Sequence, residues 1–204
     1  MELVRKPELI ELRLADDPDA WRGLGFDVDE NDNLDLGGVR LRFGFEGDGV
    51  VGWSFDLIGV QCELDGLPTP LPSIRLPPPF HTHPNGATGL DHLVVFTDDF
   101  DRTARALDAA GLALGREDQT DFGHAGFRRI GPSILELVER TDGNGARFWG
   151  LGIVVISLEA LAEQLGERLG PIRPAVQPGR KVATLDAAAA GIKTPVVFMS
   201  PEPP

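Results

Sequence analysis

Two side chains capable of acid–base chemistry stand at the two ends of one segment of this chain. His92 lies in the apolar run that opens the segment Gly89–Glu139, and Glu136 lies in the apolar run that closes it. An imidazole and a carboxylate can ligate a divalent metal or exchange protons with a substrate. If both reach one cavity, we expect a charge-neutralising pair with shifted pKa values, catalytic with or without a metal.

Both residues also have a structural interpretation. The alternative for His92 is a core histidine that is hydrogen-bonded to a backbone carbonyl. Glu136 is flanked by apolar residues, and an unpaired carboxylate is costly to bury. The alternative for Glu136 is therefore a solvated position or an ion pair with an arginine such as Arg128.

A second segment repeats the first without these side chains. Trp149–Pro201 follows the same order of strand, helix and closing strands. Its counterparts of His92 and Glu136 are Gly152 and Val197, at offsets of 60 and 61 residues, which is the near-constant spacing of a duplicated module. Glycine and valine cannot ligate a metal, so only the first copy carries the chemistry.

Local patterns predict the elements that position these residues. The run from Leu90 to Phe96 is apolar on both faces, which indicates a central strand. Asp98 or Asp99 is expected to cap the following helix, and Ser157 the corresponding helix of the second copy, which we expect to end at Gly170.

The chain divides at a proline-rich stretch. We predict a degenerate N-terminal module over 1–66, a proline-rich linker over 67–84 and a two-module domain over 85–204, whose modules are 85–142 and 147–204. In the N-terminal copy the places of His92 and Glu136 fall near Ile10 and Arg42, so this module is expected to lack ligands.

Composition limits the class of protein. The 204 residues are 42% hydrophobic, which supports a packed core, and a lone cysteine, Cys62, excludes an internal disulfide. The net charge is −13, of which 1–66 contributes −10 (16 Asp and Glu against 6 Lys and Arg). An acidic surface disfavours nucleic acid, and the absence of a signal peptide or long apolar run predicts a cytoplasmic protein without membrane partners.

The order of these motifs resembles the vicinal oxygen chelate superfamily, which contains glyoxalase I, fosfomycin-resistance enzymes, extradiol dioxygenases and bleomycin-resistance proteins. The resemblance covers residues 85–204 and extends weakly to 1–66. Residues 83–92 also resemble uncharacterised glyoxalase-like proteins. Its motifs are Gly89–Val95, Asp98–Asp101, Gly131–Leu137 and Phe148–Ile153. It implies an α+β fold in which paired βαβββ modules form a half-open, mixed β-sheet barrel around a cavity, with a homodimer as the expected assembly.

The resemblance also implies a metal site. Family members hold a divalent cation with His or Gln and Glu side chains, which makes His92 and Glu136 the candidate metal ligands here. Such ligands suit Zn, Mn, Fe, Ni or Co. Most catalytic sites fix three protein ligands, so the third would come from His124, His81 or His83, or else the cavity binds its small molecule without metal.

Three further residues are candidate substrate contacts: Arg180, Trp149 and His124. Arg180 follows Gln177-Pro178-Gly179 and could clamp a carboxylate or phosphate at the cavity mouth, or simply complete a turn. Trp149 could stack on a ligand or pack in the core.

Two functions follow from the sequence. The first is a glyoxalase-like, metal-dependent lyase or isomerase that acts on a small oxygenated metabolite through His92 and Glu136. The alternative is a non-catalytic protein of the bleomycin-resistance type that binds or sequesters a small molecule. An extradiol dioxygenase is disfavoured, because a triad of two histidines and one glutamate is not visible.

Overall fold

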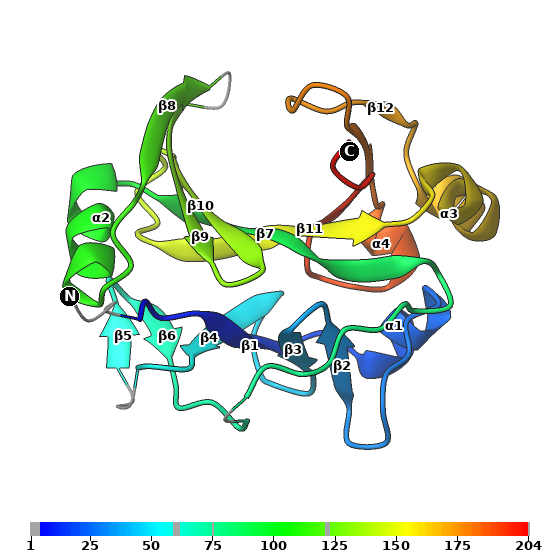
Figure 1. Cartoon of the computed structure of the whole chain (residues 1–204), viewed down its shortest axis with the longest axis horizontal. Helices are drawn as coiled ribbons and strands as arrows, with labels where there is room; N and C mark the ends of the chain where they lie inside the picture. The colour runs from blue at the N-terminus through cyan, green and yellow to red at the C-terminus, as the bar shows by residue number, and fades with distance from the viewer. Residues whose placement is uncertain (1–4, 59–61, 75, 121–122, 204) are drawn as a thin grey trace.

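The computed structural model describes residues 5–58, 62–74, 76–120 and 123–203. Three sheets and four α-helices make an α+β fold (Figure 1). The elements in chain order are β1 (Leu9–Leu14), α1 (Pro18–Gly23), β2 (Asn33–Leu36), β3 (Val39–Arg42), β4 (Val50–Phe55), β5 (Cys62–Leu64), β6 (Leu67–Thr69), β7 (Ala87–Thr97), α2 (Phe100–Ala109), β8 (Arg116–Thr120), β9 (Gly123–Ile130), β10 (Ser133–Glu139), β11 (Arg147–Val155), α3 (Leu158–Leu165), the 3₁₀ helix η1 (Gly166–Arg168), β12 (Arg173–Pro174), β13 (Lys181–Thr184), α4 (Ala187–Ala190) and β14 (Val196–Met199).

The predicted pair of βαβββ modules is confirmed. One module is β7-α2-β8-β9-β10, and the other is β11-α3-β12-β13-β14 with α4 inserted before its last strand. They form one eight-stranded sheet in the order β12-β13-β14-β11-β7-β10-β9-β8, with the opening strands β7 and β11 antiparallel at its centre. The sheet curves so that its edge strands β8 and β12 stand opposite each other, with α2 and α3 at its two ends (Figure 1). The concave face of this sheet is called the trough below.

Polar caps set the starts of the helices as the sequence predicts. The Asp99 side chain accepts a hydrogen bond from the backbone N–H of Arg102, and the Ser157 hydroxyl accepts one from Ala160. The end of α3 differs from the prediction. It stops at Leu165, because Gly166 takes a positive φ of 57° that few other residues tolerate.

The N-terminal segment forms a separate four-stranded sheet, ordered β2-β3-β1-β4. As in the first module, its opening strand is followed by a capped helix and pairs in parallel with a later strand, here β3. The copy has one strand fewer on that side, because β4 pairs with the opposite edge of β1. It therefore repeats the start of the module rather than the whole of it.

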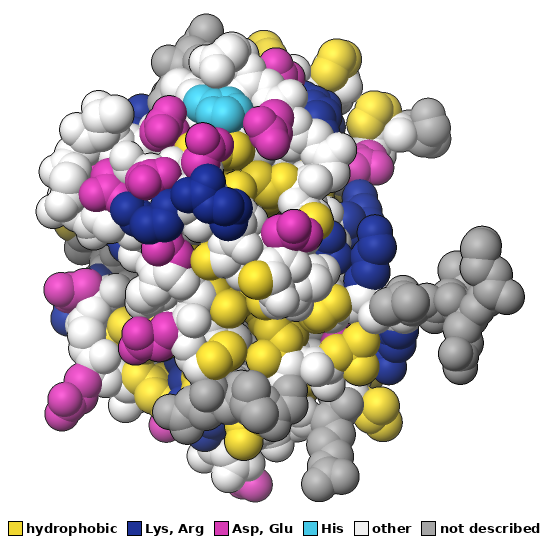
Figure 2. All heavy atoms as spheres, turned by 90° about the vertical axis from the view of Figure 1, so that its left-hand side faces the viewer, with side chains coloured by type: hydrophobic (Ala, Val, Ile, Leu, Met, Phe, Trp, Pro, Cys, Tyr) yellow, Lys and Arg dark blue, Asp and Glu magenta, His cyan; other side chains and the backbone are white. Residues whose placement is uncertain are grey.

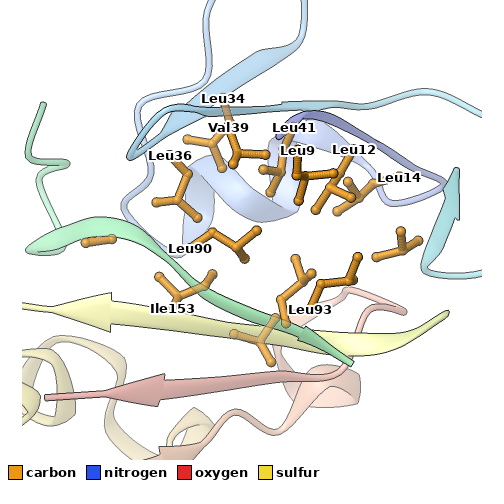
Figure 3. Packing of buried hydrophobic residues seen from close by; sticks show 14 of the residues in the cluster. Leu9, Leu12, Leu14, Leu34, Leu36, Val39, Leu41, Leu90, Leu93 and Ile153 are labelled. Carbon is orange, nitrogen blue, oxygen red and sulfur yellow. The ribbon is translucent and has the colours of Figure 1, made fainter. Parts of the chain in front are cut away.

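This small sheet packs on the face of the large sheet that lies away from the trough. Leucines of β1, β2 and β3 point at Leu90 and Leu93 of β7 and Ile153 of β11 (Figure 3). One hydrophobic cluster runs through all three modules, and β6 already occupies the start of the expected linker. The division into domains stays a prediction, because the N-terminal segment and the two later modules share one hydrophobic core.

The described surface carries charges of both signs. Figure 2 views the molecule from the α2 side and shows acidic and basic side chains intermixed around a hydrophobic strip. None of the helices in the described ranges is long and apolar enough to cross a membrane.

Candidate functional site in the trough of the large sheet

Strand pairing places His92 and Glu136 on the same face of the large sheet. Ile134 of β10 is the Cα partner of His92, and Glu136 is the partner of Val94, so the two side chains belong to neighbouring rows. The alternate residues Leu93 and Leu135 are fully buried against the N-terminal sheet. Because successive side chains on a strand point to opposite faces, His92 and Glu136 face the trough.

The ring of His92 lies across the backbone of Gly152. These two residues are Cα partners in the antiparallel pair of β7 and β11, as a two-fold relation between equivalent positions requires. A Cβ atom on Gly152 would lie 2.2 Å from Cε1 of His92. Because Gly152 of the second module has no side chain, the ring of His92 from the first module fits above its backbone.

A β-bulge turns Asp91 toward this histidine. The pairing of β7 with β11 skips Asp91, since His92 pairs with Gly152 while Leu90 pairs with Ile153. The extra residue lets neighbouring side chains share one side of the strand. Nδ1 of His92 lies 2.8 Å from Oδ2 of Asp91, so the carboxylate holds the ring with its proton on Nδ1 and leaves Nε2 as an acceptor.

Arg180 holds Asp91 from the second module. Its Nη2 atom donates to Oδ1 of Asp91 at 2.7 Å, and its Nε and Nη2 atoms donate to the carbonyl of Ser200 at 3.0 and 2.9 Å. Although burial raises the pKa of Asp91, the hydrogen bonds from His92 and Arg180 bring it below its usual value. Arg180 is itself buried, so it joins the site as a support for Asp91 rather than at a cavity mouth.

Glu136 has no such support. Its carboxylate makes no hydrogen bond or ion pair to any residue in the described ranges, whereas the expected partner Arg128 donates to the carbonyl of Ala113. Burial raises the pKa of Glu136, His92 opposes the rise, and Asp91 adds to it. A desolvated carboxylate of this kind retains its proton at higher pH than an ordinary glutamate.

The donor set does not fit a resident divalent cation. Two atoms that ligate one ion usually lie about 3 Å apart, yet no hydrogen bond or ion pair joins His92 to Glu136. In the second module Gly152 takes the place of His92, whereas the register places Met199, and not the predicted Val197, at the position of Glu136. Neither glycine nor methionine supplies an oxygen or imidazole donor. Among the described residues, no group of three His, Cys, Asp or Glu side chains is arranged to hold a metal.

The other candidate residues fall at different places. His124 stacks on Phe100 at 3.8 Å between ring centroids and bonds to Glu117, so it faces α2 and not His92. Trp149 is 41% exposed and stacks on Phe96, which lies in the trough two rows from His92. Of the proposed substrate contacts, only Trp149 presents a free surface to the trough.

His83 serves the packing of the N-terminal segment. Its Nδ1 atom accepts from the backbone N–H of Asp27, and Nε2 lies 3.1 Å from the carbonyl of Asp35. Both ring nitrogens are occupied, so His83 cannot ligate a metal in this conformation. The neighbouring His81 ring is exposed and lies 4.2 Å from that of His83.

The sequence prediction missed Asp91 and the supporting role of Arg180. Asp91 adjoins His92, but ordinary alternation along a strand would send the two side chains to opposite faces. Only the bulge reverses this, and the signal for it is weak in a single sequence. Arg180 lies 89 residues from Asp91, and no spacing rule connects the two.

Comparison with solved structures identifies related folds. Methylmalonyl-CoA epimerase from Mycobacterium tuberculosis is 20% identical, with 58% of this chain and 91% of the epimerase covered and a TM-score of 0.49. A variant of the Streptomyces coelicolor epimerase in complex with 2-nitronate-propionyl-CoA is 18% identical, covering 56% and 97%, with a TM-score of 0.45. A hypothetical protein from Bacillus halodurans, BH1468, is 19% identical, covering 56% and 95%, with a TM-score of 0.45.

No protein-family model and no curated protein matches this chain. The fold assignment rests on strand order, the two βαβββ modules and the half-open sheet, which are the features that the vicinal oxygen chelate resemblance implies. Activity has to be argued from the trough itself.

Proposed function

We propose that this chain is a glyoxalase-like protein that transfers a proton on a small oxygenated molecule bound in the trough, with Glu136 as the acid–base group. The observation that carries the proposal is the partnerless, half-buried carboxylate of Glu136. A carboxylate that is partly desolvated and bound to no protein group is free to exchange a proton with a bound molecule. The direction of its pKa shift moves Glu136 toward the range in which a carboxyl group both gains and loses protons.

His92 supplies the second polar contact. Its Nδ1 is fixed by Asp91, so Nε2 can accept a hydrogen bond from a hydroxyl group or take up a proton from the bound molecule. Asp91 and Arg180 act as positioning residues, because Asp91 holds the ring and the buried Arg180 holds Asp91. This arrangement orients a histidine as a carboxylate does in other acid–base sites.

The proposed chemistry is proton transfer next to a carbonyl or hydroxyl group. Glu136 would remove a proton from carbon and return it, while Nε2 of His92 holds a hydroxyl group of the bound molecule by accepting its hydrogen bond. No step passes through a metal, because the donor set of His92 and Glu136 does not fit one. The first function predicted from the sequence is thereby narrowed to its acid–base form.

The test is hydrogen exchange in D₂O containing a chelator. A panel of small 2-oxo acids, 2-hydroxy acids and thioesters is incubated with the protein, and loss of the proton on the adjacent carbon is followed by NMR. We expect exchange with wild type and a loss of at least about 100-fold with Glu136→Gln, the lower range for removal of a general base. Glu163→Gln, on the exposed face of α3, is the matched control.

A binding protein remains the second candidate, supported by one observation. Trp149 and Phe96 stack at 5.3 Å between centroids and leave an exposed indole beside the trough, a surface suited to a flat ligand. Ligands that raise the melting temperature without any exchange in D₂O, in wild type and Glu136→Gln alike, would overturn the acid–base proposal and favour sequestration.

A further inference from the structure

A groove of about 570 Å³ opens beside the trough, at the edge where β8 and β9 begin to separate. Its apolar floor includes Phe127 and Ile134. Phe127 is the Cα partner of Glu136, and Ile134 is the partner of His92, so the floor continues the two rows that carry the candidate site. Neither His92 nor Glu136 lines this groove, so it is a separate hollow beside the candidate site.

Positive charge gathers in this groove although the chain as a whole is acidic. Lys6, Arg116, Arg128 and Arg129 line it, against one carboxylate, Glu8. The chain carries a net charge of −13, so a groove lined by four basic side chains is unusual for this sequence. Arg116 is ion-paired with Asp118, and the remaining positive charge attracts anions and repels cations.

Arg128 is the decisive residue. It is only 8% exposed, and its Nη1 atom donates to the carbonyl of Ala113 at 2.6 Å. Its Nε and Nη2 atoms are buried and have no hydrogen-bond partner, and no ion pair joins it to Glu8 or to Glu136. Burial lowers the pKa of Arg128, which is the mark of an uncompensated charge. These two donors are covered in this conformation, and an anion reaches them when the side chain turns toward the groove. Turned in that way, the guanidinium offers a fork that matches a carboxylate or a phosphate.

We propose that this groove binds the carboxylate or phosphate group of a small organic anion at Arg128, with the apolar body of the molecule over Phe127 and Ile134. The proposal goes beyond the function proposed above and does not depend on it, because Glu136 and His92 do not line the groove. It names the ligand class as carboxylic acids or phosphate esters with a short carbon body. Arg116, whose guanidinium lies over the Phe127 ring, and Arg129 are the neighbouring cations that add attraction at the rim.

The experiment measures binding of phenyl phosphate and inorganic phosphate by calorimetry at constant ionic strength, with benzyl alcohol as the uncharged control. We expect saturable binding of phenyl phosphate to wild type, and an affinity at least about 10-fold lower for Arg128→Met, the effect of losing one charge-assisted hydrogen bond. Arg173→Met, an exposed arginine of the second module, should bind as wild type does.

Stability separates an anion site from a structural arginine. If Arg128 serves an anion, Arg128→Met should melt no lower than wild type without ligand, because an unpaired buried charge is removed. A lower melting temperature with unaltered phosphate affinity would overturn the proposal and reduce Arg128 to its bond with Ala113. Binding of benzyl alcohol as tightly as phenyl phosphate would overturn it as well.

Two further measurements test the proposal if Arg128→Met fails to fold, and separate anion binding from the acid–base function. If Arg128→Met does not fold, the Nε–H resonance of Arg128 in wild type must shift saturably with phenyl phosphate, and a static resonance overturns the proposal. Glu136→Gln should keep full anion affinity while losing exchange in D₂O. Binding without exchange in wild type then overturns the acid–base function alone, whereas exchange without anion binding overturns the groove alone.

Discussion

The two modules of the large sheet share one topology and differ in chemistry. The first carries His92 and Glu136 on its trough face, and the second carries Gly152 and Met199 at the same positions of the register. The difference is more than loss, because the His92 ring fills the space above Gly152. A symmetric scaffold has thus become an asymmetric site, in which one module provides reactive groups and the other makes room for them.

The second module also contributes support. Arg180 reaches from the turn before β13 to Asp91 in β7, and Asp91 in turn holds the His92 ring. Reactive residues and the residues that position them therefore come from different copies. Four predictions follow from this arrangement, and they are given from the largest expected effect on stability to the smallest.

The largest effect is expected from Arg180→Met. Removing one partner of a buried ion pair leaves the other charge uncompensated, which typically costs about 3 kcal/mol of unfolding free energy. The pKa of Asp91 is lowered in the folded protein, so its stabilising contribution is present above the unfolded pKa and is lost as pH falls through the folded pKa. Urea denaturation should therefore show a wide gap between variant and wild type at pH 7 that narrows below about pH 4.

A variant as stable as wild type at pH 7 would contradict this prediction. It would mean that Arg180 is a plain turn residue, and the second module would lose its role in holding the site. The matched control is Arg173→Met on β12, which is exposed in the same module and should leave stability unchanged.

The sequence predicts the scaffold well because its signals are local or periodic. The apolar run around His92, the Asp99 and Ser157 caps, and the offset of 60 residues between His92 and Gly152 all act over short distances or repeat along the chain. The offset of 61 residues is wrong, because the closing strand of the second module is shifted so that Met199 stands at the position of Glu136. The position of Gly152 opposite His92 also follows from the repeat. These features need no knowledge of which distant segments meet.

The site is less predictable because it depends on distant contacts and one local irregularity. The expected pair of Glu136 with Arg128 does not form, since their Cα atoms belong to adjacent rows whose side chains point to opposite faces. His124 lies four residues before Arg128 on β9, so its side chain points to the same face of the sheet, where it stacks on Phe100 of α2. Asp91 faces His92 only through a bulge, and Arg180 meets Asp91 only after the second module folds back.

The second prediction tests whether Gly152 is space for His92. Gly152→Ala places a Cβ atom against the ring and should cost about 2 kcal/mol, as overpacking of a core does. In a His92→Ala background the same substitution should cost much less, so the double-mutant cycle should show a coupling energy of more than about 1 kcal/mol. Additive effects in the cycle would show that the glycine is required by the backbone and that the modules diverged independently.

The third prediction concerns the cost of keeping Glu136. A raised pKa means that the folded protein resists ionisation of this group, so its contribution is full below the unfolded pKa and is lost as pH rises through the folded pKa. Glu136→Gln should therefore raise the unfolding free energy at pH 8 by about 1 kcal/mol, the low end for an unsatisfied group because the carboxylate is partly exposed. The gain should vanish below about pH 4, and Glu163→Gln should show none. A loss of stability at pH 8 would assign Glu136 a structural partner and weaken its catalytic role.

The fourth prediction concerns metal binding, for which we expect the smallest effect on the melting temperature of wild type. His92 and Glu136 do not form a closed donor set, so wild type should bind no equivalent of Zn²⁺ or Co²⁺ by plasma mass spectrometry and should melt unchanged after chelation. Val197 is the Cα partner of Gly152, which in turn partners His92, so Val197→Glu adds a carboxylate in the row of the histidine. That variant should gain metal-dependent stabilisation that rises with metal concentration, while Val197→Gln should not. Metal bound by wild type and lost in His92→Ala would refute the acid–base interpretation, because it would show that the first module closes a metal site without help from the second.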